Sequence, residues 1–303
     1  MLIDRFILFL QNIDGIGDGS IRRLIVGNCF KNFNPKTLED ILNFIKSHKN
    51  YFSRKNIIDN LTLNDIKIAN EKRKELEKKN EELGIKYISF FSEKYPYRFK
   101  KMKETKACDF PIIIYYKGDI GLLNAKNTCA IIGTRKPSLK ALNVGFEISK
   151  KMTENGYVII SGLAEGCDTI AHKSCLDAGG KTIAIVGTGL DTVFPKSNKS
   201  LLDEILKKSG LVISEYPIGF KGASFSFAQR DRLQAACSDI VIPIQTSING
   251  GTMRASKLCI NEYGNRLLVV NPSLVDDGDI DGNMYLIKEY FAKSIDDLND
   301  IKL

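Results

Sequence analysis

The feature that most constrains this chain is a series of short apolar runs, each followed at once by a glycine-bearing turn. The runs cover residues 129–132, 157–160, 182–186 and 240–244, and the turns are Gly133-Thr134-Arg135-Lys136, Ser161-Gly162-Leu163, Gly187-Thr188-Gly189 and Gly250-Gly251-Thr252. Such runs are typical of parallel strands buried on both faces, and the loops after them form the ligand crevice of an open α/β sheet. Because glycine lets backbone N–H groups approach an anion closely, the pattern predicts a phosphate-reading surface.

The elements around these runs predict an α/β chain in three parts. Residues 1–85 form a small helical domain, residues 86–104 a linker, and residues 105–303 a Rossmann-type, doubly wound, mostly parallel sheet. Further strands are expected at 211–214 and 267–270, and helices near 139–155, 166–178, 199–208, 228–237 and 252–263.

The start of the helical domain has a specific pattern. Two apolar helical segments flank the turn Gly15-Ile16-Gly17. Helix-hairpin-helix modules use this pattern to offer backbone amides to a DNA phosphate. A plain turn between two helices, packing Ile16 into a small bundle, explains the pattern equally well.

The charge of the chain favours a polyanionic partner. The formal net charge is +8, and residues 1–120, 121–270 and 271–303 carry +7, +6 and −5. A basic body suits nucleic acid. The alternative is that a Lys-rich, Trp-free composition reflects genomic base bias alone.

The composition also indicates the cellular compartment of the protein. The seven cysteines form no CxxC pair and several lie in apolar segments, so we expect reduced, mostly buried thiols in a cytoplasmic protein. No apolar stretch is long enough to span a membrane, and with two histidines a zinc site is not expected.

Several catalytic motifs are missing. The first turn is not GxGxxG, and the chain has neither GxxxxGK[ST] nor GxSxG. His172 follows Asp168 at helical spacing, which fits a base with its orienting acid, but a structural pair explains it more simply. We therefore expect no catalytic residues, no cofactor and no enzymatic activity.

What remains is a set of cations near the turns. They are Arg135, Lys136, Lys181, Arg230, Arg232 and Arg254. Guanidinium groups bind phosphates bidentately, and cations from several loops suit a single strand better than one small phosphate. Phe225 and Phe227 are placed to stack on an unpaired base, or to serve as core anchors.

Several segments in one order resemble the DprA/Smf family. They are IIGTRKPS (131–138), SGLAEGCDTIAHKSCLDAGGKTIAIVGTGLDTVFPKSN (161–198), LVISEYPIG (211–219), FAQRDRLQAACSDIVIPI (227–244) and GGTMRAS (250–256). The match covers residues 105–300, with a closing helix over 282–298, and the N-terminal domain resembles the family's more loosely. The resemblance implies a Rossmann-type, homodimeric protein that binds single-stranded DNA and loads a RecA-type recombinase, as in natural transformation.

The family's DNA-contacting positions carry over where the sequence agrees. These are Gly133, Thr134, Arg135, Ser161, Gly162, Lys181, Phe227, Arg230 and Arg232; from the residues themselves we add Lys136, Gly250, Gly251 and Arg254. The chain departs from the family at Glu165, where a cation is usual, and at Asp231, where RNR has become RDR. It also ends at Leu303 without the winged helix that many members append, so we expect a divergent branch, serving a mobile element or phage defence.

Two other functions fit the same sheet. One is a nucleotide-hydrolysing enzyme like the lysine-decarboxylase-like phosphoribohydrolases, whose PGGxGTxxE resembles Gly250-Gly251-Thr252, although no acid follows until Glu262. The other is a nucleotide-sensing module of a defence system.

Overall fold

The computed structural model describes residues 3–31, 33–275, 278, 280–298 and 301. The chain divides into two compact units, residues 1–115 and 116–303. We describe each unit by itself. None of the helices within the described ranges has the length and apolarity needed to cross a membrane.

The first unit begins with five helices. They are α1 (Ile3–Gln11), α2 (Asp18–Val26), α3 (Leu38–Ser47), α4 (Lys55–Asp59) and α5 (Leu63–Glu82). The predicted helix–turn–helix is present, with Ile16 buried and Gly15 at a φ of +89°. A Cβ on Gly15 would lie 2.9 Å from Ile57, so both backbone angle and space require glycine. The burial of Ile16 and the close packing of Gly15 fit a plain turn between two helices of a small bundle.

The segment predicted as a linker is structured and belongs to the first unit. It contains β1 (Lys86–Ser89), α6 (Tyr97–Lys101) and a 3₁₀ turn at Met102–Glu104. The backbone N–H of Ser89 donates to Asp4 Oδ1 at 3.0 Å, which ties β1 to α1. The unit boundary at 115/116 therefore differs from the predicted divisions at 85 and 105, and β2 (Ile113–Gly118) straddles it.

The second unit is built on a parallel sheet. Its strands are β3 (Thr128–Ile132), β4 (Val158–Ser161), β5 (Thr182–Ile185), β6 (Leu211–Ser214), β7 (Ile240–Pro243), β8 (Arg266–Val270) and β9 (Lys293–Ile295). They are arranged in the order β6-β5-β4-β3-β7-β8-β9, and their pairings are parallel. The chain starts at β3, adds strands on one side, and returns to add β7 on the other, so the topological switch lies between β3 and β7. The predicted Rossmann-type sheet is confirmed.

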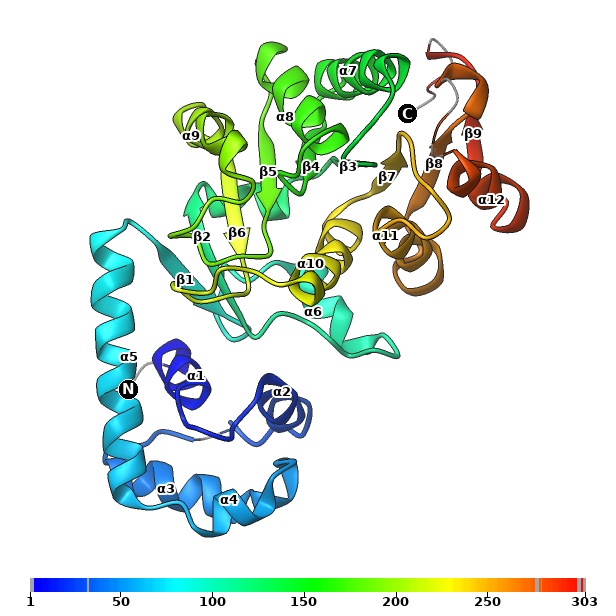
Figure 1. Ribbon diagram of the computed structural model, residues 1–303. Helices are drawn as coiled ribbons and strands as arrows, with labels where there is room; N and C mark the ends of the chain where they lie inside the picture. The colour runs from blue at the N-terminus through cyan, green and yellow to red at the C-terminus, as the bar shows by residue number, and fades with distance from the viewer. Residues whose placement is uncertain (1–2, 32, 276–277, 279, 299–300, 302–303) are drawn as a thin grey trace. The chain divides into compact units, whose positions relative to one another are not determined.

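Helices cover both faces of this sheet. They are α7 (Leu139–Glu154), α8 (Cys167–Asp177), α9 (Lys199–Lys207), α10 (Ser224–Cys237), α11 (Thr252–Leu258), which continues as a π turn over Cys259–Tyr263, and α12 (Asp281–Glu289). Figure 1 shows α7, α8 and α9 on one side of the strands and α10 and α11 on the other. This alternation follows from right-handed crossovers on either side of the switch point.

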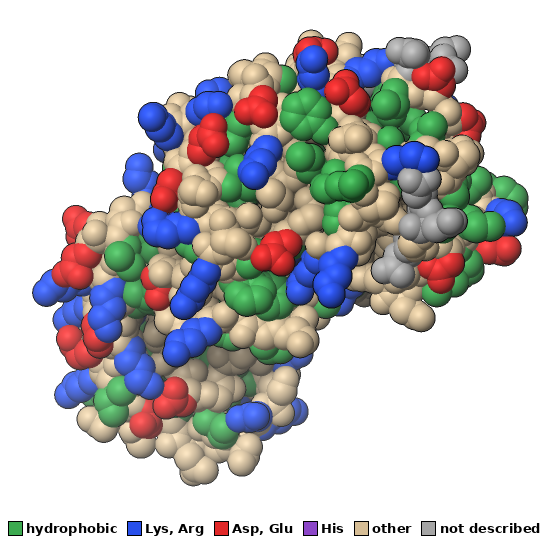
Figure 2. Space-filling model, turned by 45° about the horizontal axis from the view of Figure 1, so that its top comes forward, with side chains coloured by type: hydrophobic (Ala, Val, Ile, Leu, Met, Phe, Trp, Pro, Cys, Tyr) green, Lys and Arg blue, Asp and Glu red, His purple; other side chains and the backbone are tan. Residues whose placement is uncertain are grey.

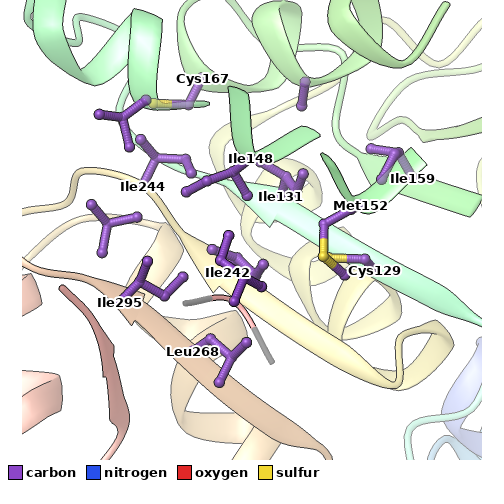
Figure 3. Close-up of a cluster of buried hydrophobic side chains, with 14 of the residues drawn as sticks. Cys129, Ile131, Ile148, Met152, Ile159, Cys167, Ile242, Ile244, Leu268 and Ile295 are labelled. Carbon is purple, nitrogen blue, oxygen red and sulfur yellow. The ribbon is translucent and has the colours of Figure 1, made fainter. Parts of the chain in front are cut away.

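The core between β3, β4, β7 and the α7–α8 layer is filled by aliphatic and cysteine side chains. Figure 3 shows Ile131 of β3, Ile242 of β7 and Ile244, which directly follows β7, near Ile148 of α7 and Cys167 of α8. All seven cysteines are free thiols and five are buried, as predicted. Burial raises the pKa of the Cys167 thiol to about 12, so this thiol stays protonated and acts as an apolar core group.

The predicted closing helix is wrong over its second half. α12 ends at Glu289, and β9 follows and pairs with β8 in the register Leu268↔Lys293. β9 extends the sheet and pairs with backbone N–H and C=O groups along the edge of β8.

Candidate functional site

The predicted glycine turns meet at the carboxyl ends of β3, β4 and β7, beside the topological switch point. The turn after β3 is joined to the loop after β7, because Thr134 N–H donates to the Gln245 carbonyl at 2.8 Å. The side chain of Gln245 also accepts from Ser138 N–H at 2.9 Å, at the start of α7. These bonds hold the two loops together, in the position where open α/β sheets bind ligands.

A crevice of about 680 Å³ opens between these loops. Among the residues that line it are eight of the thirteen predicted site residues, namely Gly133, Thr134, Arg135, Lys136, Phe227, Arg230, Gly250 and Gly251. Gly162 lines a smaller adjoining hollow together with Arg135, Phe227 and Arg230. The sequence therefore predicted most of one continuous surface.

The floor of the crevice is a buried ionic network around Arg230. The Arg230 guanidinium lies 3.7 Å from Asp168 Oδ2, and its Nε lies 3.2 Å from Asp231 Oδ1. Gln234, with its amide turned to satisfy both neighbours, accepts from Arg230 Nη1 at 2.9 Å and donates to Asp231 at 3.2 Å. Arg230 is therefore held by acids, and it presents only part of its charge to the crevice.

The Arg230 guanidinium leaves no space for a side chain at position 162, so this residue must be glycine. A Cβ at this position would lie 1.2 Å from Arg230 Nη1. The Gly162 N–H donates to Asp168 Oδ2 at 3.1 Å, and Ala164 N–H donates to the same oxygen at 3.3 Å. The serine–glycine turn thus positions Asp168, which in turn positions Arg230.

The pKa of the Asp231 carboxyl is raised above its ordinary value. Burial raises the pKa of its carboxyl to about 6, and the nearby Asp168 carboxylate raises it too, while Arg230, Arg254 and Arg135 lower it. A buried carboxyl near a second carboxylate gives up its proton reluctantly. The charge of the crevice floor therefore changes near neutral pH.

The rim of the crevice carries exposed cations. Arg135 and Lys136 are exposed, and the Arg135 guanidinium lies 5.9 Å from the centre of the Phe227 ring. Arg254, on the first turn of α11, is exposed and donates to Gln229 Oε1 at 3.3 Å. On the face in Figure 2, Lys and Arg side chains are interspersed with Asp and Glu.

Lys181 does not lie at this rim, and the expectation that it does is wrong. It directly precedes β5, and its carbonyl accepts from Ile159 N–H at 3.0 Å near the start of β4. Because the strands are parallel, residues before a strand lie at the opposite edge from residues after one. The exposed Lys181 ammonium donates to the Lys208 carbonyl at 2.7 Å.

Arg232 is also not a free cation of the rim. It is 2% exposed, and its two terminal nitrogens each donate to Glu215 at 2.6 Å. Two positions along a helix differ by about 200°, so Arg232 points away from the crevice that Arg230 faces. Similarly, Ser161 is buried and its hydroxyl donates to the Ile131 carbonyl at 2.7 Å, which is a structural role.

Sequence reasoning missed the acidic and amide members of the floor. Asp168 was considered only as a partner for His172, but His172 Nδ1 lies 2.7 Å from Thr182 Oγ1 instead. Burial, together with the Arg230 charge, lowers the pKa of His172 to about 3, so this ring stays neutral. Asp231 was predicted only as a departure from the family's RNR pattern. That departure was the signal in the sequence for an acid in the crevice floor. The other departure, Glu165, is exposed and accepts from Ser197 Oγ at 2.8 Å.

A family model and several known proteins resemble this chain. The model of the family described as DNA recombination-mediator protein A matches residues 86–302. The DNA processing protein DprA of Streptococcus pneumoniae is 37% identical over 181 residues, 60% of this chain and 62% of that protein. DprA of Bacillus subtilis is 30% identical over 195 residues, 64% of this chain and 63% of that protein. In both comparisons the match spans less than two thirds of the relative's length.

The solved structures that match this fold include two DNA processing proteins. The X-ray structure of DNA processing protein A from Streptococcus pneumoniae has a TM-score of 0.78 at 27% identity and covers 99% of this chain and 98% of its own. A second, which concerns the single-stranded DNA binding mode of DNA processing protein A from Helicobacter pylori, has a TM-score of 0.62 at 31% identity. It covers 71% of this chain and 93% of its own.

Proposed function

The chain belongs to the DNA recombination-mediator protein A family, and from this membership we propose that it binds single-stranded DNA and loads a RecA-type recombinase onto it. The observation that carries the proposal is the crevice at the β3–β7 switch point. It combines glycine turns with the exposed Arg135 and Lys136, and a relative of known structure is described by its single-stranded DNA binding mode.

The proposed contacts differ in kind. Phosphates lie against the backbone amides of the turns at Gly133 and Gly251, while Arg135, Lys136 and Arg254 neutralise them. The Gly250 N–H is not among these donors, because it donates to the Ser247 carbonyl at 2.9 Å. Phe227 offers a ring beside Arg135. Arg230 acts from the floor as a partly shared charge, because Asp168 and Asp231 already hold it. Lys181 and Arg232 are left out of the direct contacts because of where they lie.

The remaining parts of the proposal concern context. We infer a homodimer that acts in the cytoplasm, with which seven free thiols are consistent. The mode of action is binding and delivery rather than catalysis, and the pathway is natural transformation or a related role in a mobile element or in defence.

A salt-titrated binding assay tests the proposal. Fluorescence anisotropy is measured with a labelled oligo-dT and with a duplex of equal length, from low to moderate salt. For single strands the log–log slope is about −0.7 per neutralised phosphate. We expect tighter binding to the single strand and a slope that corresponds to several contacts. Equal or undetectable binding of both ligands contradicts the proposal.

One observation favours a second candidate, nucleotide binding or hydrolysis. The Asp231 carboxyl, whose pKa is about 6, lines the crevice, although no acid follows Gly250-Gly251-Thr252 in the sequence until Glu262. A carboxyl of this kind is suited to general acid–base work. Calorimetry with nucleoside monophosphates, and chromatography for released base, distinguishes this candidate from the first.

A further inference from the structure

Three aromatic rings gather on the surface beside the crevice. Phe225, the second residue of α10, is 59% exposed. Its ring centre lies 6.1 Å from that of Phe220 and 6.5 Å from that of Tyr216, edge-on to both. Tyr216 and Phe220 stack on each other with centres 4.4 Å apart and planes inclined by 14°. We refer to Tyr216, Phe220 and Phe225 as the aromatic ledge.

The ledge is distinct from the crevice but continuous with it. α10 begins at Ser224, four residues earlier than the sequence predicted, which places both Phe225 and Phe227 in its first turns. Ser224 and Phe227 line the crevice, whereas Phe225 does not. Two helical positions differ by about 200°, so the two rings point to different sides of the helix. The ring centre of Phe227 lies 5.1 Å from that of Phe194, while the Phe225 ring lies beside Phe220.

The charges around the ledge favour an anionic chain. Glu215, which directly precedes Tyr216, is neutralised by its two hydrogen bonds to Arg232. Lys221, which directly follows Phe220, is exposed. The ledge therefore has an exposed cation on one side and a neutralised acid on the other, and it leads to the basic rim of the crevice. A flat, exposed ring next to cations is the arrangement that single-strand binding proteins use to stack bases.

The size of the ledge also favours bases over a protein partner. A stable protein interface buries about 800 Å² on each partner, far more than three side chains provide. A single base, in contrast, is covered by one ring. The Phe225 side chain has no polar group that could form a hydrogen bond with water. Stacking on a base removes the apolar face of its ring from solvent.

We propose that the aromatic ledge is a second subsite, which stacks unpaired bases of the DNA strand whose phosphates lie in the crevice. This proposal rests on the proposed function and extends it, because it assigns base contacts to residues outside the crevice. It predicts that the strand leaves the crevice past Ser224 toward Phe225. The stacking is tolerant of sequence, since every base has a π-face.

The test uses oligonucleotides that carry 2-aminopurine, whose fluorescence is quenched when it stacks. The variant is Phe225→Ala in the full chain, with Phe291→Ala as a matched control, because Phe291 is 89% exposed and lies outside both the ledge and the crevice lining. We expect F225A to lose most of the quenching and to weaken oligonucleotide binding about five-fold or more. F291A keeps both, and F225W, which retains an aromatic face, restores quenching where F225L does not.

The outcomes separate this proposal from the proposed function. If the unchanged protein binds single strands and F225A matches F291A in quenching and affinity, the ledge does not hold bases and the inference is wrong, while the proposed function stands. If the unchanged protein does not bind single-stranded DNA, both this inference and the proposed function are wrong. If F225A leaves DNA binding intact but changes the mass by light scattering, the ledge is a protein interface and the inference is overturned. Equal thermal melting of F225A and the unchanged protein excludes misfolding as the cause.

Discussion

Arg232 donates two hydrogen bonds of 2.6 Å to Glu215, one from each terminal nitrogen of its guanidinium group. The Arg232 side chain is 3% exposed and that of Glu215 is 12% exposed, so the pair joins α10 to the end of β6 inside the protein. A buried pair of this kind specifies how two elements meet. Removal of one partner leaves the other charge buried without compensation.

The first prediction follows from this pair. We expect Glu215→Ala to lower the free energy of unfolding by about 3–5 kcal/mol, because the Arg232 charge stays buried. Urea unfolding followed by circular dichroism measures the change. The matched control is Arg135→Ala, an exposed position whose substitution is expected to change stability by about 0.5 kcal/mol or less. If E215A unfolds at the same urea concentration as the unchanged protein, the pair does not stabilise the fold and the structural role is wrong.

The sequence predicted the frame of this molecule better than the state of its charges. Apolar runs and glycine turns were sufficient for β3, β4, β5 and β7, because burial on both faces of a parallel sheet leaves a pattern in the residues themselves. The edge of the sheet at which Lys181 lies was also predictable from the sequence, because this residue directly precedes its strand while the glycine turns follow theirs.

The partners of the arginines were less accessible from sequence. Glu215 lies 17 positions before Arg232, and Asp168 lies 62 positions before Arg230. Only the folded chain brings these pairs together. The exposure of Phe225 depended likewise on where α10 begins, and helix boundaries are set by local capping: Ser226 Oγ accepts from Ala223 N–H at 2.9 Å.

The second prediction separates the two edges of the sheet. We expect Arg135→Ala to weaken binding of oligo-dT about five- to twenty-fold at low salt and to reduce the log–log salt slope by about 0.7, the value for one phosphate contact. Lys181→Ala removes a cation that is also exposed but lies at the opposite edge, and it is expected to leave both quantities unchanged. Fluorescence anisotropy across a salt series measures both variants. A larger loss for K181A than for R135A shows that the strand follows the other edge.

The third prediction concerns pH. The pKa of Asp231 is about 6 in the folded protein against an ordinary 3.8, so this carboxyl loses its proton between pH 5 and 7. Below this range the crevice floor is less negative and binds phosphates more tightly. Affinity for oligo-dT is therefore expected to fall as pH rises from 5 to 7.5, by about five-fold, which corresponds to about 1 kcal/mol of repulsion.

Asp231→Asn is the matched variant for this pH effect. It is expected to bind as tightly at pH 7.5 as at pH 5, and to equal the unchanged protein at pH 5. The same shift makes a stability prediction: the unfolded chain ionises first, so the contribution of Asp231 is greatest below pH 4 and is lost as pH rises through 6. A pH profile of DNA binding that D231N leaves unaltered assigns the titration to another group.

The last prediction tests the link between the serine–glycine turn and the crevice floor. A Cβ on residue 162 would lie 1.2 Å from Arg230 Nη1, so Gly162→Ala must displace the guanidinium from Asp168 and Asp231. We expect a loss of about 3 kcal/mol in unfolding free energy, since overpacking is added to the breaking of a buried ion pair. The control is Gly251→Ala, where the nearest atom to the new Cβ is Asp231 Oδ2 at 3.6 Å and φ is −57°. G251A is expected to keep its stability within about 1 kcal/mol. Equal stability of the two variants means that Arg230 can leave the floor at little cost, and then its guanidinium is free to follow a phosphate in the crevice.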